Sequence, residues 1–332
     1  DAGLREGLPM PFECRNGGCG VCQCTLVHGQ VDLLPFQASA LTADERAAGR
    51  TLLCCAIAQS DVEIQYVPQA GAKVLPVRQY TARVTTLESL SSDVIRLCLQ
   101  IEGGARLPFH PGQYINIVLD DGAKRSFSFA TAPHAEGDIE LHVRLVEGGR
   151  FTTAVFSTMR VGDTLRFEGP MGAFTLREDS DKPIIFVAGS TGFAPVKSML
   201  EHAFHSGMKR RMILYWGVRS RSGLYLGALA EAWAREHDNF TFIPVLSAPL
   251  PEDHWTGRTG LVHEAILADF PDLSAHQVYA CGSVQMVEAA YPAFAKHGIA
   301  SDDCFSDAFH LAPQRPLQGH DAEMVKLGGS HV

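Results

Sequence analysis

Hydrophobic and polar positions change their pattern twice along the chain, and these changes divide it into three parts. In the first part, residues 61–67 alternate strictly between polar and apolar side chains, which predicts a strand with one buried face. Residues 23–34 predict a strand pair that turns at His28-Gly29, and Thr42-Ala-Asp-Glu45 has the spacing of a capping box that starts a short helix. Residues 68–77 carry two prolines and a glycine and predict a linker. We therefore expect a first domain over residues 1–70.

The second part predicts short strands at regular spacing, separated by glycine, proline and aspartate turns. One helix, over about residues 151–159, interrupts the series. This pattern favours a small antiparallel barrel, which we expect as a domain over residues 77–178. The candidate strands are residues 79–87, 93–101, 113–119, 125–130, 138–146 and 163–168.

In the third part, continuous apolar runs alternate with stretches of helical period. Pro183-Ile-Ile-Phe-Val-Ala188 has the character of a buried parallel strand and leads into a helix with apolar residues at helical spacing. Such alternation predicts a doubly wound parallel sheet over residues 182–310, and residues 311–332 predict a flexible tail. Further strands are expected at residues 211–216, 240–246 and 277–281, a terminal strand near 304–306, and helices at 223–236, 260–268 and 284–296.

Composition narrows the class of protein. The chain has 332 residues, of which 46% are hydrophobic, and a net charge of −9, which argues against a nucleic-acid partner. Eight acidic residues against four arginines give residues 1–70 a net charge of −4, which suits either a basic redox partner or simple solubility. No apolar run has the length of a membrane span, so we expect no membrane partner. Nine cysteines, an odd count without a secretory pattern, favour reduced thiols in the cytoplasm, and the start at Asp1 is expected to mark a fragment.

Three cysteines stand close together in Cys14-Arg-Asn-Gly-Gly-Cys19-Gly-Val-Cys22. The spacing C-x4-C-x2-C, with a distant fourth thiolate, is that of a plant-type [2Fe–2S] cluster. Glycines suit such a loop because it must curl so that amide groups approach the sulfurs. A zinc site would favour two matched C-x2-C pairs instead. Cys54 and Cys55 both lie downstream, and the spacing alone leaves the choice between them open.

The predicted barrel carries two candidate sites for a nucleotide. Arg125-Ser-Phe-Ser128 offers a guanidinium, which matches phosphate oxygens. Gly148-Gly149-Arg150-Phe151-Thr152-Thr153 opens the predicted helix, and free N–H groups at a helix N-terminus bind phosphate. The plain alternative for the second stretch is a glycine turn with a capping threonine. Gly169-Pro-Met-Gly172 follows downstream.

The predicted parallel sheet carries a further candidate site. Gly189-Ser-Thr-Gly192 joins a strand to a helix at a switch point of the sheet, where a pyrophosphate binds, although it lacks the G-x-G-x-x-G pattern. Tyr279-Ala-Cys281-Gly282 ends a later strand, and its plain alternative is a buried cysteine. No acid occurs between Tyr215 and Leu226, whereas Arg219 and Arg221 do, which taken alone favours NADPH.

These motifs together resemble the ferredoxin–NADP reductase superfamily joined to a plant-type ferredoxin domain. The resemblance implies a β-grasp cluster domain, here without its first hairpin, a flavin barrel and a nicotinamide domain. It implies Cys54 as fourth ligand beside Cys14, Cys19 and Cys22, with Cys55 facing away. Ser190 stands where the superfamily's G-G-T-G has a glycine, and Phe127 stands where its R-x-Y-S has a tyrosine.

The resemblance also implies roles for single residues. Arg125 pairs with the flavin pyrophosphate, Phe127 packs on the flavin ring and Ser128 donates near the reactive nitrogen. Cys281 lies against the nicotinamide ring, and Phe309 shields the flavin face. Ser128 and Cys281 are the expected catalytic residues. The other expected cofactor contacts are Ser126, His142, Val143, Arg144, Gly149, Phe151, Thr152, Thr153, Gly189, Thr191, Gly192, Arg219 and Gly282.

The order cluster, flavin, nicotinamide resembles bacterial ferredoxin–flavin–NAD(P)H reductases, and in particular those of the CDP-6-deoxy-glucoseen reductase type. Four stretches carry this closer similarity: Arg125–Pro133, Phe167–Gly172, Leu214–Gly217 and Trp255–Gly260. The resemblance implies that NAD(P)H reduces FAD and that single electrons then pass through the [2Fe–2S] cluster to a partner protein. It favours NADH as donor, with NADPH as the alternative. Two other hypotheses stay open: a reductase of an aromatic-ring dioxygenase or multicomponent monooxygenase, and a non-catalytic iron–sulfur sensor, which would not oxidise NADH with a dye acceptor.

Overall fold

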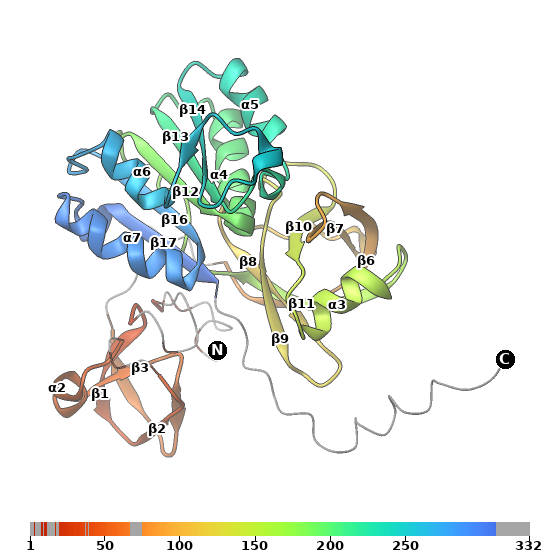
Figure 1. Ribbon diagram of the computed structural model, residues 1–332. Helices are drawn as coiled ribbons and strands as arrows, with labels where there is room; N and C mark the ends of the chain where they lie inside the picture. The colour runs from red at the N-terminus through yellow and green to blue at the C-terminus, as the bar shows by residue number, and fades with distance from the viewer. Residues whose placement is uncertain are drawn as a thin grey trace.

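The computed structural model forms three groups of strands that follow one another along the chain (Figure 1). It describes residues 3, 8, 10, 11, 17, 20–36, 38, 40–66 and 75–309. The predictions for Cys14, for Cys19 and for the tail over residues 311–332 lie outside the described residues. No helix of the described ranges combines the length and the apolar character that a bilayer crossing needs.

The first group, residues 20–66, is named the cluster segment. Its antiparallel sheet has the order β3-β1-β5, with β1 Gln23–His28, β3 Arg50–Leu52 and β5 Glu63–Gln65. The predicted strand pair at His28-Gly29 is wrong in its pairing. Both edges of β1 are already taken by β3 and β5, so β2 (Val31–Leu33) pairs with β4 (Ala56–Ala58) instead.

Helix α2 (Ala43–Ala47) of the cluster segment begins as predicted. The Thr42 hydroxyl accepts the Glu45 N–H at 3.3 Å, and the Glu45 carboxylate accepts the Thr42 N–H at 2.8 Å, which confirms the capping box. No residue of the helix is buried, and the small core of this segment is made of Cys22, Ala40, Leu41, Leu52 and Cys55.

The second group is an antiparallel barrel, as predicted. Its strand order is β10-β7-β6-β11-β8-β9, and a bridge from Phe129 to Leu141 brings the ends of the series together. Alternate side chains, among them Leu97, Ile115 and Phe167, fill its interior. The strands are β6 Arg78–Ser89, β7 Val94–Ile101, β8 Tyr114–Val118, β9 Lys124–Ser128, β10 Ile139–Arg144 and β11 Thr164–Met171, and the helices are α3 Arg150–Ser157 and the 3-10 turn η1 Glu102–Gly104.

The third group is a sheet in the order β15-β14-β13-β12-β16-β17, and every pair of neighbouring strands in it is parallel. The order reverses between β12 and β16, so this is the switch point of a doubly wound sheet. The strands are β12 Ile184–Gly189, β13 Met212–Val218, β14 Phe240–Leu246, β15 Arg258–Thr259, β16 Gln277–Ser283 and β17 Cys304–Phe309. The short strand β15 was not predicted.

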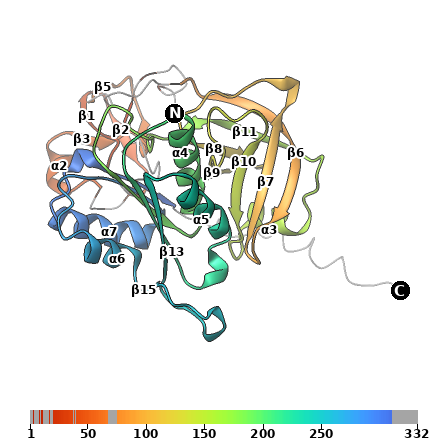
Figure 2. The same ribbon diagram turned by 90° about the horizontal axis from the view of Figure 1, so that it is seen from above.

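Helices cover both faces of the parallel sheet (Figure 2). Helices α4 and α5 pack with one core, and α6 and α7 pack with the other. The helices are α4 Phe193–His205, α5 Gly227–Glu236, α6 Val262–Asp269 and α7 Val284–Lys296, and the 3-10 turns are η2 Ser190–Gly192, η3 Arg221–Gly223, η4 Pro251–Asp253 and η5 Ser301–Asp303. This arrangement confirms the α/β class predicted for the third part.

At the switch point, the backbone of the loop after β12 touches the backbone at the end of β16. A Cβ on Gly192 would lie 2.0 Å from the Cys281 carbonyl oxygen, and a Cβ on Gly282 would lie 3.0 Å from the Gly189 Cα. Turn η2 therefore rests directly on β16, and only glycine fits there.

We predict that Gly192→Ala destabilises the fold by about 1–3 kcal/mol, because the added methyl group would meet backbone that cannot rotate away. The measurement is the free energy of unfolding in urea. Gly227→Ala is the control: Gly227 begins α5, and a Cβ there would lie 3.3 Å from the Leu224 side chain. An unchanged stability of Gly192→Ala would contradict the close packing.

Candidate cofactor sites

Glycines of the cluster loop hold conformations that other residues avoid. Gly17 and Gly20 both have φ +76°. A Cβ on Gly17 would lie 2.6 Å from the Phe36 Cβ and 2.7 Å from the Cys55 Sγ. The loop therefore uses glycine both for its left-handed turns and for close contact with the segment after β2.

Two cysteines predicted as ligands lie side by side. The Sγ atoms of Cys22 and Cys54 are 3.2 Å apart, and that of Cys55 lies 3.5 Å from that of Cys54. Two thiolates bound to one tetrahedral metal at about 2.3 Å lie roughly 3.8 Å apart. The sulfurs of Cys22 and Cys54 would therefore need to move only slightly apart to bind one iron. Among the described residues no three acid, histidine or cysteine side chains form a metal group. Cys14 and Cys19, the other two expected ligands, lie outside the described residues.

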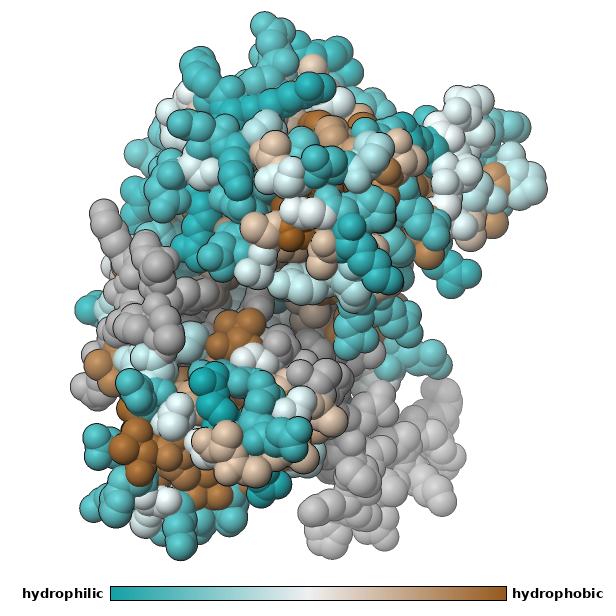
Figure 3. All heavy atoms as spheres, turned by 90° about the vertical axis from the view of Figure 1, so that its left-hand side faces the viewer, coloured by the Kyte–Doolittle hydropathy of each residue, from teal (hydrophilic) through white to brown (hydrophobic). Residues whose placement is uncertain are grey.

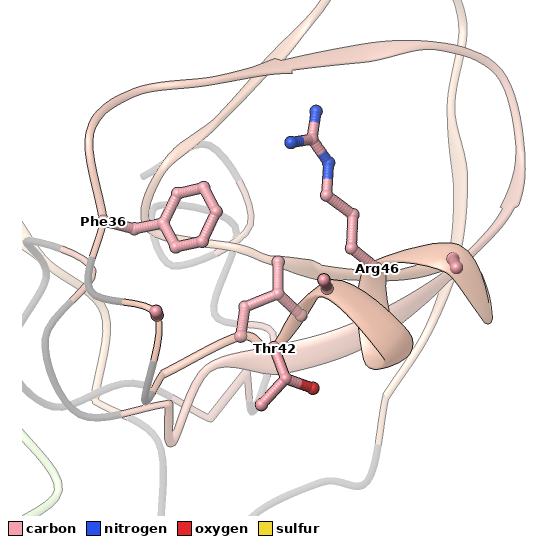
Figure 4. A pocket seen from close by; sticks show the side chains of 7 residues that line it. Phe36, Thr42 and Arg46 are labelled. Atoms are coloured by element: carbon pink, nitrogen blue, oxygen red, sulfur yellow. The ribbon is translucent and has the colours of Figure 1, made fainter.

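A pocket of about 590 Å³ opens beside α2 in the cluster segment. Figure 4 shows Phe36, Thr42 and Arg46 around it. Because Phe36 also packs against Gly17, the pocket adjoins the cluster loop. It is separate from the flavin and nicotinamide candidates, which lie on the other two groups of strands.

Apolar side chains are also exposed on the cluster segment. Val27, Leu34 and Ile57 are 54%, 50% and 46% exposed. Figure 3 shows apolar atoms gathered on the lower part of one face of the molecule, where Figure 1 places this segment. The segment thus combines apolar surface with an acidic sequence.

The barrel brings two sets of predicted flavin residues together. The rings of Phe127 on β9 and Phe151 on α3 lie 5.2 Å apart. Ser128 is buried at the end of β9 opposite Tyr114, and Ser126 donates its hydroxyl to Asn116 at 2.7 Å. Arg125 is half-buried, and its guanidinium donates to the Lys124 carbonyl at 2.8 Å. The cation therefore lies on the strand that carries Phe127.

Helix α3 begins beside this strand, with Gly149 as its N-cap. No side chain caps it, so its first N–H groups are available to an anion. The Thr152 hydroxyl bonds to the backbone of Val146 and Gly149, whereas Thr153 is exposed. The helix start and the Arg125 strand thus suit the two phosphates of a flavin dinucleotide.

Successive side chains of β10 point to opposite sides of the strand, so the three residues predicted there as cofactor contacts do not share one side. Val143 points into the barrel core, whereas His142 and Arg144 point toward the parallel sheet. Arg144 donates to Asp93 at 2.9 Å and to the Ser190 hydroxyl at 3.1 Å. Both nitrogens of His142 are bonded to protein side chains, Nδ1 to Tyr225 and Nε2 to Glu140.

The predicted nicotinamide residues meet at the carboxyl ends of β12 and β16. Gly189 and Gly192 face Cys281 and Gly282 across the backbone contact described above, and Thr191 is buried beside them. Ser190 has φ +51°, the left-handed conformation for which a glycine would serve best. Cys281 is fully buried. Phe309 lies at the end of β17, paired with Ser283, and Arg219 is exposed after β13.

Three residues at the boundary between barrel and sheet were not predicted. Lys197 on α4 is 5% exposed, and its ammonium group lies 2.9 Å from the Ala130 carbonyl oxygen and 3.3 Å from Glu140 on β10. Tyr225, before α5, bonds to His142 at 2.9 Å. The sequence gives only two weak signals of this group. One is a lone lysine on the apolar face of a helix, and the other is a glutamate two positions before a histidine on a strand.

The charges of this group are set by their surroundings. Burial raises the pKa of Glu140, but the hydrogen bond from His142 and the charge of Lys197 outweigh it and lower the pKa to about 2. Burial lowers the pKa of His142. A neutral His142 must donate from Nε2 to the Glu140 carboxylate, so its Nδ1 accepts the Tyr225 hydroxyl.

Comparison with known proteins matches each group of strands. Residues 1–59 match the 2Fe-2S iron-sulfur cluster binding domain, residues 81–176 the oxidoreductase FAD-binding domain, and residues 186–291 the oxidoreductase NAD-binding domain. The matches confirm the predicted [2Fe–2S] cluster, FAD and nicotinamide dinucleotide as the cofactors.

Several relatives match along almost the whole chain. The CDP-6-deoxy-L-threo-D-glycero-4-hexulose-3-dehydrase reductase of Yersinia pestis is 40% identical over 93% of this chain and 92% of its own. Reductase component 2 of terephthalate 1,2-dioxygenase from Comamonas sp. is 37% identical over 94% of this chain and 92% of its own. The crystal structure of the Amycolatopsis cytochrome P450 reductase GcoB has a TM-score of 0.83 and 33% identity, over 93% of this chain and 92% of that chain. The chain therefore belongs to the family of ferredoxin–flavin–NAD(P)H reductases, oxidoreductases that pass electrons from a nicotinamide dinucleotide to a partner protein.

Proposed function

We propose that the electron acceptor of this reductase is a deoxysugar dehydrase, with NADH as the preferred donor. The observation that carries this proposal is the 40% identity to the Yersinia dehydrase reductase over 92% of its length. The alternative acceptor is an oxygenase, which the terephthalate dioxygenase reductase and the P450 reductase support. The exposed apolar side chains and acidic charge of the cluster segment support this segment as the side that meets the acceptor.

The bound cofactors supply the redox chemistry: FAD takes an electron pair from NAD(P)H and the [2Fe–2S] cluster relays single electrons. The chain supplies the placement. We propose that Arg125 and the N-terminus of α3 hold the flavin pyrophosphate and that Phe127 packs on the ring beside a Ser128 hydroxyl donor. The half-buried Arg125 and the contact of Phe127 with Phe151 support these roles.

For the nicotinamide side, we propose that the loop Gly189–Gly192 holds the pyrophosphate and that Cys281 packs on the nicotinamide ring. The position of this loop between the end of β12 and the start of α4, at the switch point of the sheet, supports the first role. The domain bounds 1–70, 77–178 and 182–310 remain proposals, supported by the three matched ranges. We also propose the cytoplasm as the location, since cluster thiolates need a reducing compartment.

The acceptor is tested by mixing the protein and NADH with a CDP-6-deoxy-hexulose-3-dehydrase, or with the oxygenase component of terephthalate dioxygenase. We expect dehydrase turnover to be faster by about tenfold or more, which corresponds to roughly 1.4 kcal/mol of preference. The readout is the rate of product formation with each acceptor at the same concentration of reductase. Faster coupling to the oxygenase would replace the dehydrase with the oxygenase as acceptor.

The ligand set is tested by serine variants of single cysteines in the intact protein. We expect Cys54→Ser to abolish the visible [2Fe–2S] absorbance and NADH-driven cytochrome c reduction, while ferricyanide reduction by the flavin persists. The loss follows because a hydroxyl is a poor replacement for a thiolate on iron. Cys55→Ser and Cys24→Ser are the matched controls and should keep the absorbance. Loss in Cys55→Ser with retention in Cys54→Ser would reverse the assignment.

The choice of donor is tested at Arg219, which is exposed near the end of β13. We expect wild type to favour NADH and Arg219→Ala to change the NADPH to NADH ratio of kcat/KM little. If Arg219 bound a 2′-phosphate, its loss would cost on the order of 1.5–3 kcal/mol for NADPH alone. Arg235→Ala, an exposed arginine in the last turn of α5, is the control. A strong NADPH preference that collapses only in Arg219→Ala would overturn the NADH assignment.

A further inference from the structure

A buried lysine joins the barrel to the parallel sheet. Lys197 lies in α4, five residues after Gly192 of the pyrophosphate loop, and is 5% exposed. Its ammonium group donates to the Ala130 carbonyl at 2.9 Å, and it forms ion pairs with Glu140 at 3.3 Å and Glu201 at 2.9 Å. Ala130 and Glu140 belong to the barrel, so two of these three contacts cross the boundary, whereas Glu201 lies on α4 itself.

A second set of contacts continues from Glu140. Its other oxygen accepts the His142 Nε2–H at 2.8 Å, and His142 accepts the Tyr225 hydroxyl at 2.9 Å. Tyr225 packs edge-on against the rings of Phe193 and Trp216 of the parallel-sheet half. One barrel glutamate thus reaches two separate elements of that half, α4 and the segment before α5.

Charges in this group are compensated. Lys197 and Arg96 face the carboxylates of Glu140 and Glu201, and burial, which lowers the pKa of His142, favours its neutral form. Beside them, the Ser198 hydroxyl donates to the Thr131 carbonyl at 2.7 Å, a further bond across the boundary. Because each buried polar group is bonded, the two halves cannot slide past each other without leaving a buried charge unpaired.

The contacts of Lys197 link the two candidate cofactor sites through short pieces of chain. Ala130 lies two residues after Ser128, the proposed flavin contact, and Gly192 lies one residue before α4 begins. Ser128 and Gly192 are therefore connected through the Lys197 ammonium group and about one turn of α4. A shift of this group would move one cofactor site relative to the other.

We propose that Lys197, paired with Glu140, is a positioning residue that sets the placement of the nicotinamide site against the flavin site. This inference rests on the proposed cofactor sites, but not on the identity of the acceptor. Lys197 contacts Ala130, Glu140 and Glu201, none of which is a proposed cofactor contact, so it is not a catalytic residue.

The test is Lys197→Met, which keeps the length of the side chain but removes the charge. We expect the limiting rate of flavin reduction by NADH, measured anaerobically by stopped flow, to fall by about 10- to 100-fold, since small misplacements cost this much. The FAD content and the dissociation constant for NADH should stay within about twofold of wild type. In the flavin-free protein, amide hydrogen exchange of residues 128–131 should become faster.

Two further variants keep the test decisive. Lys182→Met is the matched control, since Lys182 pairs with Asp303 at 2.6 Å within the parallel-sheet half alone, and its rate should match wild type. Ser198→Ala removes the bond to Thr131 and should lower the same rate by a smaller factor. If Lys197→Met fails to fold, the rate of flavin reduction and the amide hydrogen exchange of Ser198→Ala test the proposal in its place.

Two outcomes would overturn the proposal. One is a normal rate of flavin reduction in Lys197→Met and Ser198→Ala. The other is loss of FAD and of thermal stability in Lys197→Met with an unchanged rate per bound flavin, which would make the lysine merely structural. If wild type is reduced by NADPH and not by NADH, the donor assignment fails and the same comparison is made with NADPH.

Discussion

The contact of two main chains at the switch point is the constraint on which the nicotinamide half depends. Gly192 rests on the Cys281 carbonyl, and Gly189 lies against Gly282, with the Met286 side chain beside both of the latter. Steric contact between the two backbones therefore fixes where α4 begins, because a backbone contact cannot be relieved by a change of rotamer. The same helix then carries Lys197 to the barrel, so the glycines set the position of the lysine as well.

Local patterns explain what the sequence could predict. Glycines in the cluster loop and at the switch point mark sharp turns and close approaches, and the continuous apolar runs mark buried parallel strands. The capping box at Thr42 also involves only neighbouring residues and was found correctly. Most of the fold and the position of the predicted cofactor motifs follow from such short stretches.

Contacts between distant residues explain what the sequence could not predict. Strand β2 was expected to pair with β1, but β1 has both edges occupied by strands that come later in the chain. Lys197 is 67 positions from Ala130 and 57 from Glu140, so its partners leave no local pattern. Cys54 and Cys55 are adjacent, and spacing cannot separate two neighbours; the proximity of Cys54 to Cys22 is three-dimensional information.

Ser190 connects the two proposed nucleotide sites by a hydrogen bond. It holds a left-handed conformation in the loop Gly189–Gly192, which we propose for the pyrophosphate, while its hydroxyl accepts a hydrogen bond from Arg144 of the barrel. A ligand that moves the Ser190 hydroxyl therefore also affects its hydrogen bond with Arg144 on β10. If bound flavin changes the affinity for the nicotinamide dinucleotide through this bond, thermodynamic linkage requires that the bound nicotinamide dinucleotide changes the affinity for flavin by the same factor.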